Sequence, residues 1–259
     1  NSEERCHSSM LMAKSCHDLD LMIWMKSGVR PVRVASYGSN YQFRQEKAPP
    51  EAGTRCLVDC PIEPECLYSA RKHYIDHPHR WSFYVWACLE DRDNPTIQDK
   101  IESLKTDNPF GRCVWKCDND VVDHQSVVVD FGDGSTGTMN MVGGSSRPGR
   151  SIHLVGTEGE IEGRAEDNQF LVRHPDPRPG HEYSEKMVDL DEEADTSGVS
   201  GGHGGGDLRL VEDFVRVLSG REPSISWTGI DDSVSGHLVG FSADRAREEG
   251  RGVDLEYRC

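Results

Sequence analysis

The hydrophobic pattern at the start of the chain is typical of a helix. Over residues 9–27, Leu19, Met22 and Ile23 fall on one stripe at helical spacing. Gly28 follows at the position where the C-terminal cap of such a helix is expected. The first element that the pattern predicts is therefore an amphipathic helix.

The pattern then changes to that of strands. Residues 31–43 alternate in polarity and are rich in β-branched and aromatic side chains. Residues 121–131 and 135–142 are two apolar runs joined by an Asp-Gly pair at 133–134, which is a strong hairpin signal. Three more short strands are predicted within residues 151–173. The middle of the chain therefore predicts a meander of antiparallel strands.

Two helices are predicted to close the chain. Asp207 is a good N-cap for a helix over residues 208–218. The apolar residues that share one face of that helix are Leu210, Val211, Phe214, Val215 and Leu218. A last helix is predicted over residues 231–249, with Val234, Leu238 and Phe241 on one stripe.

The remaining segments carry weaker patterns. Residues 44–80 predict an irregular lobe rich in Cys and Pro, residues 95–105 a short helix, and residues 191–206 a flexible acidic and Gly-rich loop. Together the elements predict an α+β fold, a large and mostly antiparallel sheet with helices on one face. We interpret residues 1–259 as a single substrate-binding and oligomerisation domain.

Composition excludes several classes of function. The 259 residues carry a net charge of −16, and such a field repels nucleic acid and anionic membrane surfaces. The sequence has no apolar run of roughly 18 residues that could span a bilayer. It has nine cysteines, an odd number, and no visible secretion signal, so we expect reduced thiols and a cytoplasmic location.

The first helix carries candidate chemistry. Lys14, His17 and Asp20 follow one another at intervals of three, which places them on one helix face. Histidine titrates near neutral pH, and a carboxylate one turn away can orient its ring. The same spacing is also compatible with a half-buried polar stripe or with an ion pair between the aspartate and the lysine.

Polar residues also gather before the predicted hairpin, in the stretch "CDNDVVDHQ". Asn119, Asp120, Asp123 and His124 are candidates for binding the hydroxyl groups of a substrate. Strand alternation sends Asp123 to one face and His124 to the other. The alternative interpretation is a solvated acidic turn at the entry to a strand.

Five cysteines in and near the lobe could hold a metal. They are Cys56, Cys60, Cys66, Cys113 and Cys117. A structural zinc ion is one interpretation, but the C-x3-C and C-x5-C spacings are not those of a strong zinc motif. Free thiols that pack as small hydrophobes are the interpretation we favour.

Five stretches occur in an order that resembles one enzyme family. They are "SEERCHSSMLMAKSCHDLDLMIWM", "RCLVDCPIEPECLYSARKHY", "GRCVWKCDNDVVDHQSVVVDFGDGSTGTM", "LVGTEGEIEG" and "GGHGGGDLRLVEDFVRVLSG". Together they resemble the C-terminal domain of Gfo/Idh/MocA oxidoreductases, which are NAD(P)-dependent dehydrogenases of sugars, inositols and related polyols. The resemblance covers nearly the whole chain.

The resemblance implies a site and a cofactor. In that family a histidine on the first helix of the C-terminal domain acts beside a lysine of an N-terminal dinucleotide-binding domain, and His17 matches that histidine. An aspartate is common four residues earlier, where this chain has Ala13. The resemblance also implies that His203 and Asp207 approach the substrate, and that the open sheet forms a homo-oligomer.

The dinucleotide-binding half of such an enzyme is not visible in the sequence. The sequence has no strand followed by G-x-G-x-x-G. NAD or NADP is therefore expected to bind mainly to a domain outside this chain, which begins with Asn1 and is expected to be part of a longer product. Two alternatives stay open: a glycosidase that uses NAD transiently, and a non-catalytic remnant that serves as an oligomerisation or binding domain.

Overall fold

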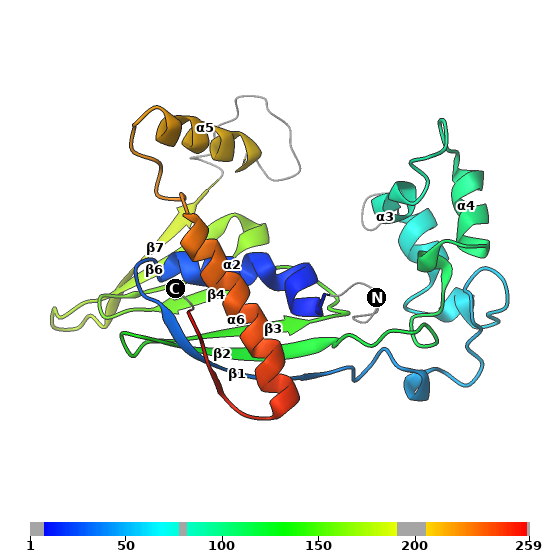
Figure 1. The fold of residues 1–259 in the computed structure, drawn as a ribbon, viewed down its shortest axis with the longest axis horizontal. Helices are drawn as coiled ribbons and strands as arrows, with labels where there is room; N and C mark the ends of the chain where they lie inside the picture. The colour runs from blue at the N-terminus through cyan, green and yellow to red at the C-terminus, as the bar shows by residue number, and fades with distance from the viewer. Residues whose placement is uncertain (1–7, 78–81, 191–205, 258–259) are drawn as a thin grey trace. The chain divides into compact units, whose positions relative to one another are not determined.

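The computed structural model describes residues 8–77, 82–190 and 206–257 (Figure 1). They form two compact units, one made of the residues up to 143 together with those from 230 onward, and the other made of residues 144–229. Across the described residues, no helix is both long and apolar enough to cross a membrane. Both units contain antiparallel sheet and helix, so the predicted α+β class is confirmed.

The first unit is built on a four-stranded sheet. Its strands are β1 (Pro31–Ser39), β2 (His124–Phe131), β3 (Thr136–Val142) and β8 (Val253–Asp254). They lie in the order β3-β2-β1-β8, and each pairs antiparallel with its neighbours. The predicted Asp-Gly turn joins β2 to β3, and Gly134 adopts the positive φ of 83° that such a turn favours. The hairpin prediction is therefore confirmed.

Helices cover one face of this sheet (Figure 1). They are the π-helical turn η1 (Leu11–Ser15), α2 (Cys16–Met25) and α6 (Ile230–Glu249). Leu19 and Ile23 of α2 are 1% and 3% exposed and pack on Val127 and Val129 of β2 in one hydrophobic core. The predicted apolar stripe of the first helix therefore lies in the core, as expected.

The packing of α6 corrects the sequence prediction. Its buried residues are Gly236, Val239, Gly240, Ala243 and Ala246. The predicted stripe faces outward instead, because Val234 is 47% exposed and Phe241 is 60% exposed. A Cβ atom at position 236 would lie 3.4 Å from the Cα atom of Asp20, so small residues let α6 approach α2 closely. The close approach of α6 to α2 therefore decides which face of α6 is buried.

An irregular lobe connects β1 to β2. Its short elements are η2 (Gln45–Lys47), η3 (Glu63–Glu65), η4 (Lys72–Asp76), α3 (Ser82–Ala87), α4 (Ile97–Lys105) and η5 (Pro109–Gly111). The predicted short helix is α4, and it begins with a capping box between Thr96 and Asp99. Ala52, Cys113 and Trp115 form a small buried cluster in the lobe.

The second unit has its own four-stranded antiparallel sheet. The strands β4 (Ser151–Val155), β5 (Glu160–Arg164), β6 (Gln169–Pro175) and β7 (Tyr183–Asp189) pair in sequence order, with the short turn η6 (Ala165–Asp167) before β6. The pattern predicted the first three of these strands but not β7. The predicted flexible loop at residues 191–206 lies, except for Gly206, outside the described residues.

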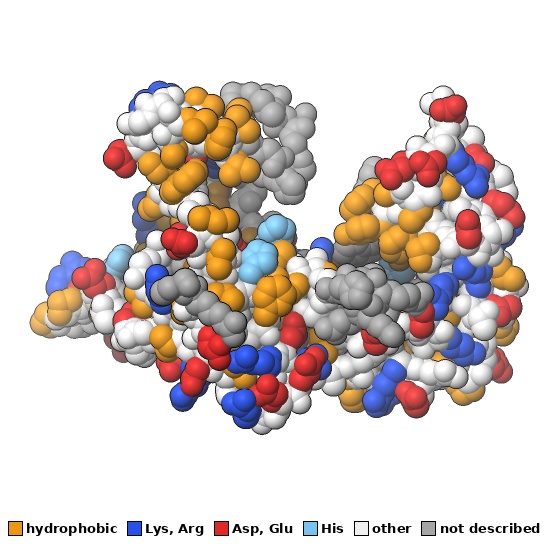
Figure 2. All heavy atoms as spheres, viewed as in Figure 1, with side chains coloured by type: hydrophobic (Ala, Val, Ile, Leu, Met, Phe, Trp, Pro, Cys, Tyr) orange, Lys and Arg blue, Asp and Glu red, His pale blue; other side chains and the backbone are white. Residues whose placement is uncertain are grey.

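Helix α5 (Gly206–Leu218) follows in the second unit and begins one residue before the predicted N-cap, Asp207. Its apolar face is exposed, with Leu210 at 68% and Phe214 at 56%. Figure 2 shows hydrophobic side chains at the surface over this helix. The amphipathic pattern therefore predicted the helix, but it did not predict that this face would be left uncovered.

Candidate functional site

Two of the three candidate residues on the first helix lie on its free face. Leu19 and Ile23 hold the opposite face of α2 in the core. Lys14, in the π-helical turn, and His17, in the first turn of α2, are both exposed. The core packing therefore fixes the helix so that the imidazole of His17 faces outward, where a ligand can reach it.

Asp20 has different surroundings. It is half-buried, and its backbone and carboxylate face α6. A Cβ atom built on Gly236 would lie 3.5 Å from the Asp20 Oδ1 atom. The structure therefore places Asp20 at the contact between α2 and α6, whereas Lys14 and His17 are open to solvent.

Asp123 is a structural clamp just before β2. Its side chain is only 8% exposed. Its Oδ2 atom accepts hydrogen bonds from three consecutive backbone amides, those of Tyr41 at 3.0 Å, Gln42 at 2.5 Å and Phe43 at 3.1 Å. The carboxylate therefore fastens the loop that leaves β1.

The second oxygen of Asp123 holds His124. The His124 Nδ1 atom lies 2.9 Å from Asp123 Oδ1. Burial alone would raise the pKa of Asp123, but the hydrogen bonds from His124 and from the three loop amides outweigh burial and lower it. The carboxylate is therefore ionised at neutral pH and accepts a hydrogen bond from the Nδ1–H group of His124. Both carboxylate oxygens of Asp123 therefore make hydrogen bonds within the chain.

His17 and His124 lie on opposite sides of the sheet. Burial alternates along β2, with Gln125, Val127 and Val129 buried under the helices. His124 belongs to the alternate set of residues, which points away from the helix layer. Its side chain is 44% exposed. Within one copy of the chain, the two histidines therefore do not face the same ligand.

The acidic turn before Asp123 makes contacts within the chain. Asp118 forms an ion pair with Arg112 at 2.7 Å. The backbone carbonyl of Asn119 accepts a hydrogen bond from the Asn40 side chain at 3.2 Å. Asp120 is exposed. The carbonyl of Asn119 thus helps to fix the loop, and its side chain remains a candidate ligand.

A buried polar group beneath the helices was missed by the sequence analysis. Gln125 is 1% exposed, and its Nε2 atom donates to Ser36 Oγ at 3.0 Å and to Asp244 Oδ1 at 3.2 Å. These bonds tie β2 to β1 and to α6. The alternation of the strand places Gln125 on the core face, but only the fold shows the partners that make this burial tolerable.

The last two candidates are His203 and Asp207. His203 falls outside the described residues. Asp207 lies in the first turn of α5, in the second unit.

The cysteines of the lobe are free thiols. Cys56, Cys60, Cys66 and Cys117 are half-buried and Cys113 is buried. Burial raises the pKa of the Cys56 and Cys66 thiols. Among the described residues, no group of three or more His, Cys, Asp or Glu side chains is arranged to hold a metal ion.

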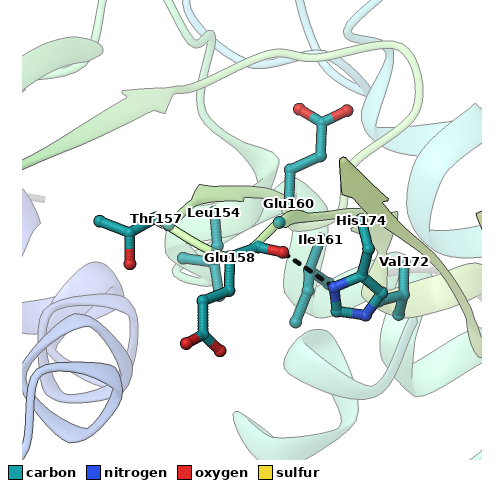
Figure 3. A pocket seen from close by; sticks show the side chains of 9 residues that line it. Leu154, Thr157, Glu158, Glu160, Ile161, Val172 and His174 are labelled. Atoms are coloured by element: carbon teal, nitrogen blue, oxygen red, sulfur yellow. Dashed lines mark hydrogen bonds between the residues drawn. The ribbon is translucent and has the colours of Figure 1, made fainter. Parts of the chain in front are cut away.

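A shallow hollow lies on each of the two units, among the residues that the structure describes. On the second unit, a hollow of about 370 Å³ is lined by Leu154, Ile161 and Val172, beside His174, whose Nδ1 atom donates to the Glu158 carbonyl at 2.9 Å (Figure 3). On the first unit, a groove of about 630 Å³ follows the exposed stripe of α6. Neither hollow contains one of the candidate residues above.

Comparison with known proteins places the chain in a family. The family model of the Gfo/Idh/MocA oxidoreductases, C-terminal alpha/beta domain, matches residues 3–255. The chain belongs to this family. The Gfo/Idh/MocA resemblance that the sequence carries is thereby confirmed.

Individual relatives agree with this assignment. The "Putative oxidoreductase YteT" of Bacillus subtilis (strain 168) is 27% identical over 233 residues, which cover 86% of this chain and 49% of YteT. An oxidoreductase domain protein from Kribbella flavida has a TM-score of 0.57 at 13% identity, covering 98% of this chain and 53% of that one. A levoglucosan dehydrogenase in complex with NADH and levoglucosan has a TM-score of 0.55 at 13% identity, covering 97% and 51%. This Gfo/Idh/MocA chain therefore spans about half the length of the relatives it matches.

Proposed function

We propose that this chain is the substrate-binding half of an NAD(P)-dependent dehydrogenase that acts on a CH–OH group of a sugar, an inositol or a related polyol. The observation that carries the proposal is the free face of α2. In a chain of this oxidoreductase family, the core holds Leu19 and Ile23 and leaves His17 and Lys14 exposed. The levoglucosan dehydrogenase of the same fold, solved with its sugar and NADH, supports a sugar-like substrate.

In this proposal His17 handles the proton of the reacting hydroxyl group. A neutral imidazole can accept that proton, and its protonated form can return it in the reverse reaction. Lys14 lies on the same exposed side and supplies a positive charge that favours an oxygen-rich ligand. Asp20, at the contact with α6, supports the position of the helix.

The residues described here do not form a dinucleotide-binding fold. Every strand pair in the described part of the chain is antiparallel, whereas dinucleotide binding in this kind of enzyme uses parallel βαβ units. We therefore assign the binding of NAD or NADP mainly to the part of the enzyme outside this chain. The nicotinamide would supply hydride transfer, and this chain would bind and orient the substrate.

Self-association through a sheet face is part of the proposal. The face of the first sheet that points away from the helices exposes Tyr37, Val128 and Val142, at 72%, 45% and 64%. Exposed apolar side chains on one face favour a partner. Light scattering on the purified chain tests this, and a monomeric mass in a folded sample would count against it.

The test of function uses the full-length gene product. It is supplied with NAD or NADP and with levoglucosan, D-glucose or myo-inositol, and the reduced nucleotide is followed by absorbance. The proposal expects reduction with at least one polyol. Hydrolysis of a glycoside without net formation of reduced nucleotide would show an NAD-dependent glycosidase instead, and no turnover with any polyol or glycoside would favour a non-catalytic domain.

A further inference from the structure

We propose that His237 of α6 is a second substrate-binding residue, whose Nε2 atom accepts a hydrogen bond from another hydroxyl group of the molecule on which His17 acts. The class of that molecule, a sugar, an inositol or a related polyol, rests on the proposed function. The placement of the two histidines does not, because it follows from the packing of α2 against α6 within the first unit.

Two close contacts bracket the histidines. A Cβ atom built on Gly236 would lie 3.4 Å from the Cα atom of Asp20, and one built on Gly240 would meet the side chain of Met12. Contacts that advance along α6 therefore go back along α2 and the η1 turn, so the helices run antiparallel. On each helix, the histidine lies between these two contacts in the sequence. The two histidines are therefore neighbours across the helix pair.

His17 points away from the sheet on the side of α2 that adjoins α6. An α-helix turns by about 100° per residue, so His17 lies about 160° around the helix from Leu19 and about 60° from Asp20. Leu19 packs in the core, and Asp20 contacts α6. Since His17 is exposed, its ring lies just outside the contact between the helices.

His237 has the same relation to its own helix. It lies about 160° around α6 from Val239 and about 60° from Gly240. Val239 packs in the core, and a Cβ atom on Gly240 would lie 3.3 Å from the Leu19 Cδ1 atom of α2. His237 is also exposed. Both histidines therefore lie on the same outer side of the contact between α2 and α6, one on each helix.

The tautomer of His237 is set by its own helix. Its Nδ1 atom lies 2.8 Å from the backbone carbonyl oxygen of Ser233, one turn earlier. A carbonyl oxygen only accepts hydrogen bonds, so Nδ1 carries the proton, and in the neutral ring Nε2 is then an acceptor. The bond also holds the ring against α6. Nε2 therefore presents a lone pair to a hydroxyl group.

The surface between the two rings suits a polyol. Side chains of a helix lean toward its N-terminus, and because these helices are antiparallel, the rings of His17 and His237 lean away from each other and leave room between them. Half-buried Asp20 lies at the helix contact between them. Phe241, one turn after His237, is 60% exposed. Hydroxyl groups can thus bind the nitrogens and the carboxylate, and C–H groups can pack on the aromatic ring.

Two substitutions of His237 separate binding from structure. His237→Leu removes the acceptor and keeps an apolar side chain of moderate size, whereas His237→Gln keeps an acceptor on a side chain of similar length. Glu248→Ala is the matched control. Glu248 is exposed on the same face of α6, roughly 16 Å further along the helix.

Steady-state kinetics of the full-length enzyme measure the effect. We expect His237→Leu to raise KM about tenfold with kcat nearly unchanged, as for a hydrogen bond made equally in the ground and transition states. His237→Gln should recover most of this loss, and Glu248→Ala should match the wild type. A wild-type KM in His237→Leu, or a glutamine variant no better than the leucine variant, would overturn the binding role.

NMR of the histidine rings in the full-length wild type requires no variant to fold. Levoglucosan, D-glucose and myo-inositol are added separately, and we expect at least one to shift the ring signals of His17 and His237 with a single dissociation constant. A neutral His237 with its proton on Nε2, a sugar that shifts His17 alone, or the failure of all three sugars to shift His237 would overturn the inference.

The inference and the proposed function fail in different ways. A full-length protein that reduces neither NAD nor NADP with any polyol would refute the proposed function, whereas a joint shift of both rings would still support a shared binding site. Turnover of a polyol that leaves the His237 signals in place would overturn the role of His237 and leave the dehydrogenase activity standing.

Discussion

Replacing Asp123 by alanine should destabilise the first unit strongly. The wild-type carboxylate is 8% exposed and accepts four hydrogen bonds, three from loop amides and one from His124. A hydrogen bond to a charged group contributes roughly 1.5–3 kcal/mol, and a donor left without a partner in a buried place adds a penalty. The contributions are not additive, and water can reach part of the exposed loop. We therefore expect a loss of about 3 kcal/mol.

Thermal unfolding followed by circular dichroism measures this loss. For a chain of this size, 1 kcal/mol corresponds to roughly 2–4 °C, so we expect Tm to fall by about 6–12 °C. Glu51→Ala, a substitution at an exposed position of the same unit, should stay within roughly 0.5 kcal/mol of the wild type. A Tm of Asp123→Ala equal to that of Glu51→Ala would refute the clamp.

The loss should also depend on pH in a defined direction. The pKa of Asp123 is lowered in the folded protein, whereas an unfolded aspartate titrates at roughly 3.9. The stability that it contributes is therefore fully present above the unfolded pKa and is lost as the pH falls through the folded pKa. The difference between the wild type and Asp123→Ala should be constant from neutral pH down to about 5 and should shrink in stronger acid. A constant difference throughout would contradict the assignment.

Three further changes test other parts of the structure. Leu19→Ala should cost roughly 2–5 kcal/mol in a denaturant melt, because Leu19 is 1% exposed in the core, and a loss under roughly 1 kcal/mol would argue against the burial of this helix face. Gly236→Ala should stabilise the fold by about 0.5–1 kcal/mol through helix propensity, because the new Cβ atom would make an ordinary contact with the Asp20 Cα atom at 3.4 Å. A lower Tm would contradict this distance between α6 and α2. Hydrogen bonds from Thr54 and Arg55 lower the pKa of Asp59 to about 2, so a carboxyl NMR titration should show its midpoint there, and a midpoint at the ordinary value of roughly 3.9 would refute these bonds.

Much of the fold could be predicted from local pattern. The stripe of Leu19 and Ile23 and the Asp-Gly turn between β2 and β3 are signals contained within a few residues, and the structure confirms both. The burial of α6 could not be predicted in the same way. Large apolar residues such as Phe241 suggest which face of the helix is buried. The buried face depends, however, on how closely α2 approaches α6, and the sequence of either helix alone does not determine that distance.

The candidate site shows the same limit. Spacing placed Lys14, His17 and Asp20 on one face, but the contact with α6 separates the surroundings of Asp20 from those of the other two. Strand alternation predicted that Asp123 and His124 point to different faces, but Asp123 lies just before β2 and its Oδ1 atom is 2.9 Å from the His124 Nδ1 atom. Alternation could not show that both carboxylate oxygens of Asp123 make hydrogen bonds within the chain. The three amides that donate to Oδ2 lie 80 to 82 residues earlier in the sequence.

The kinetics of His17→Ala in the full-length enzyme test the central claim most directly. Its helix face is exposed, so stability should stay within roughly 0.5 kcal/mol of the wild type. The loss of a positioned acid/base group should lower kcat by about 100- to 10,000-fold. His181→Ala, an exposed histidine of the second unit, should leave both quantities unchanged. Wild-type turnover in His17→Ala, or a loss of activity explained by unfolding, would show that α2 does not carry the chemistry.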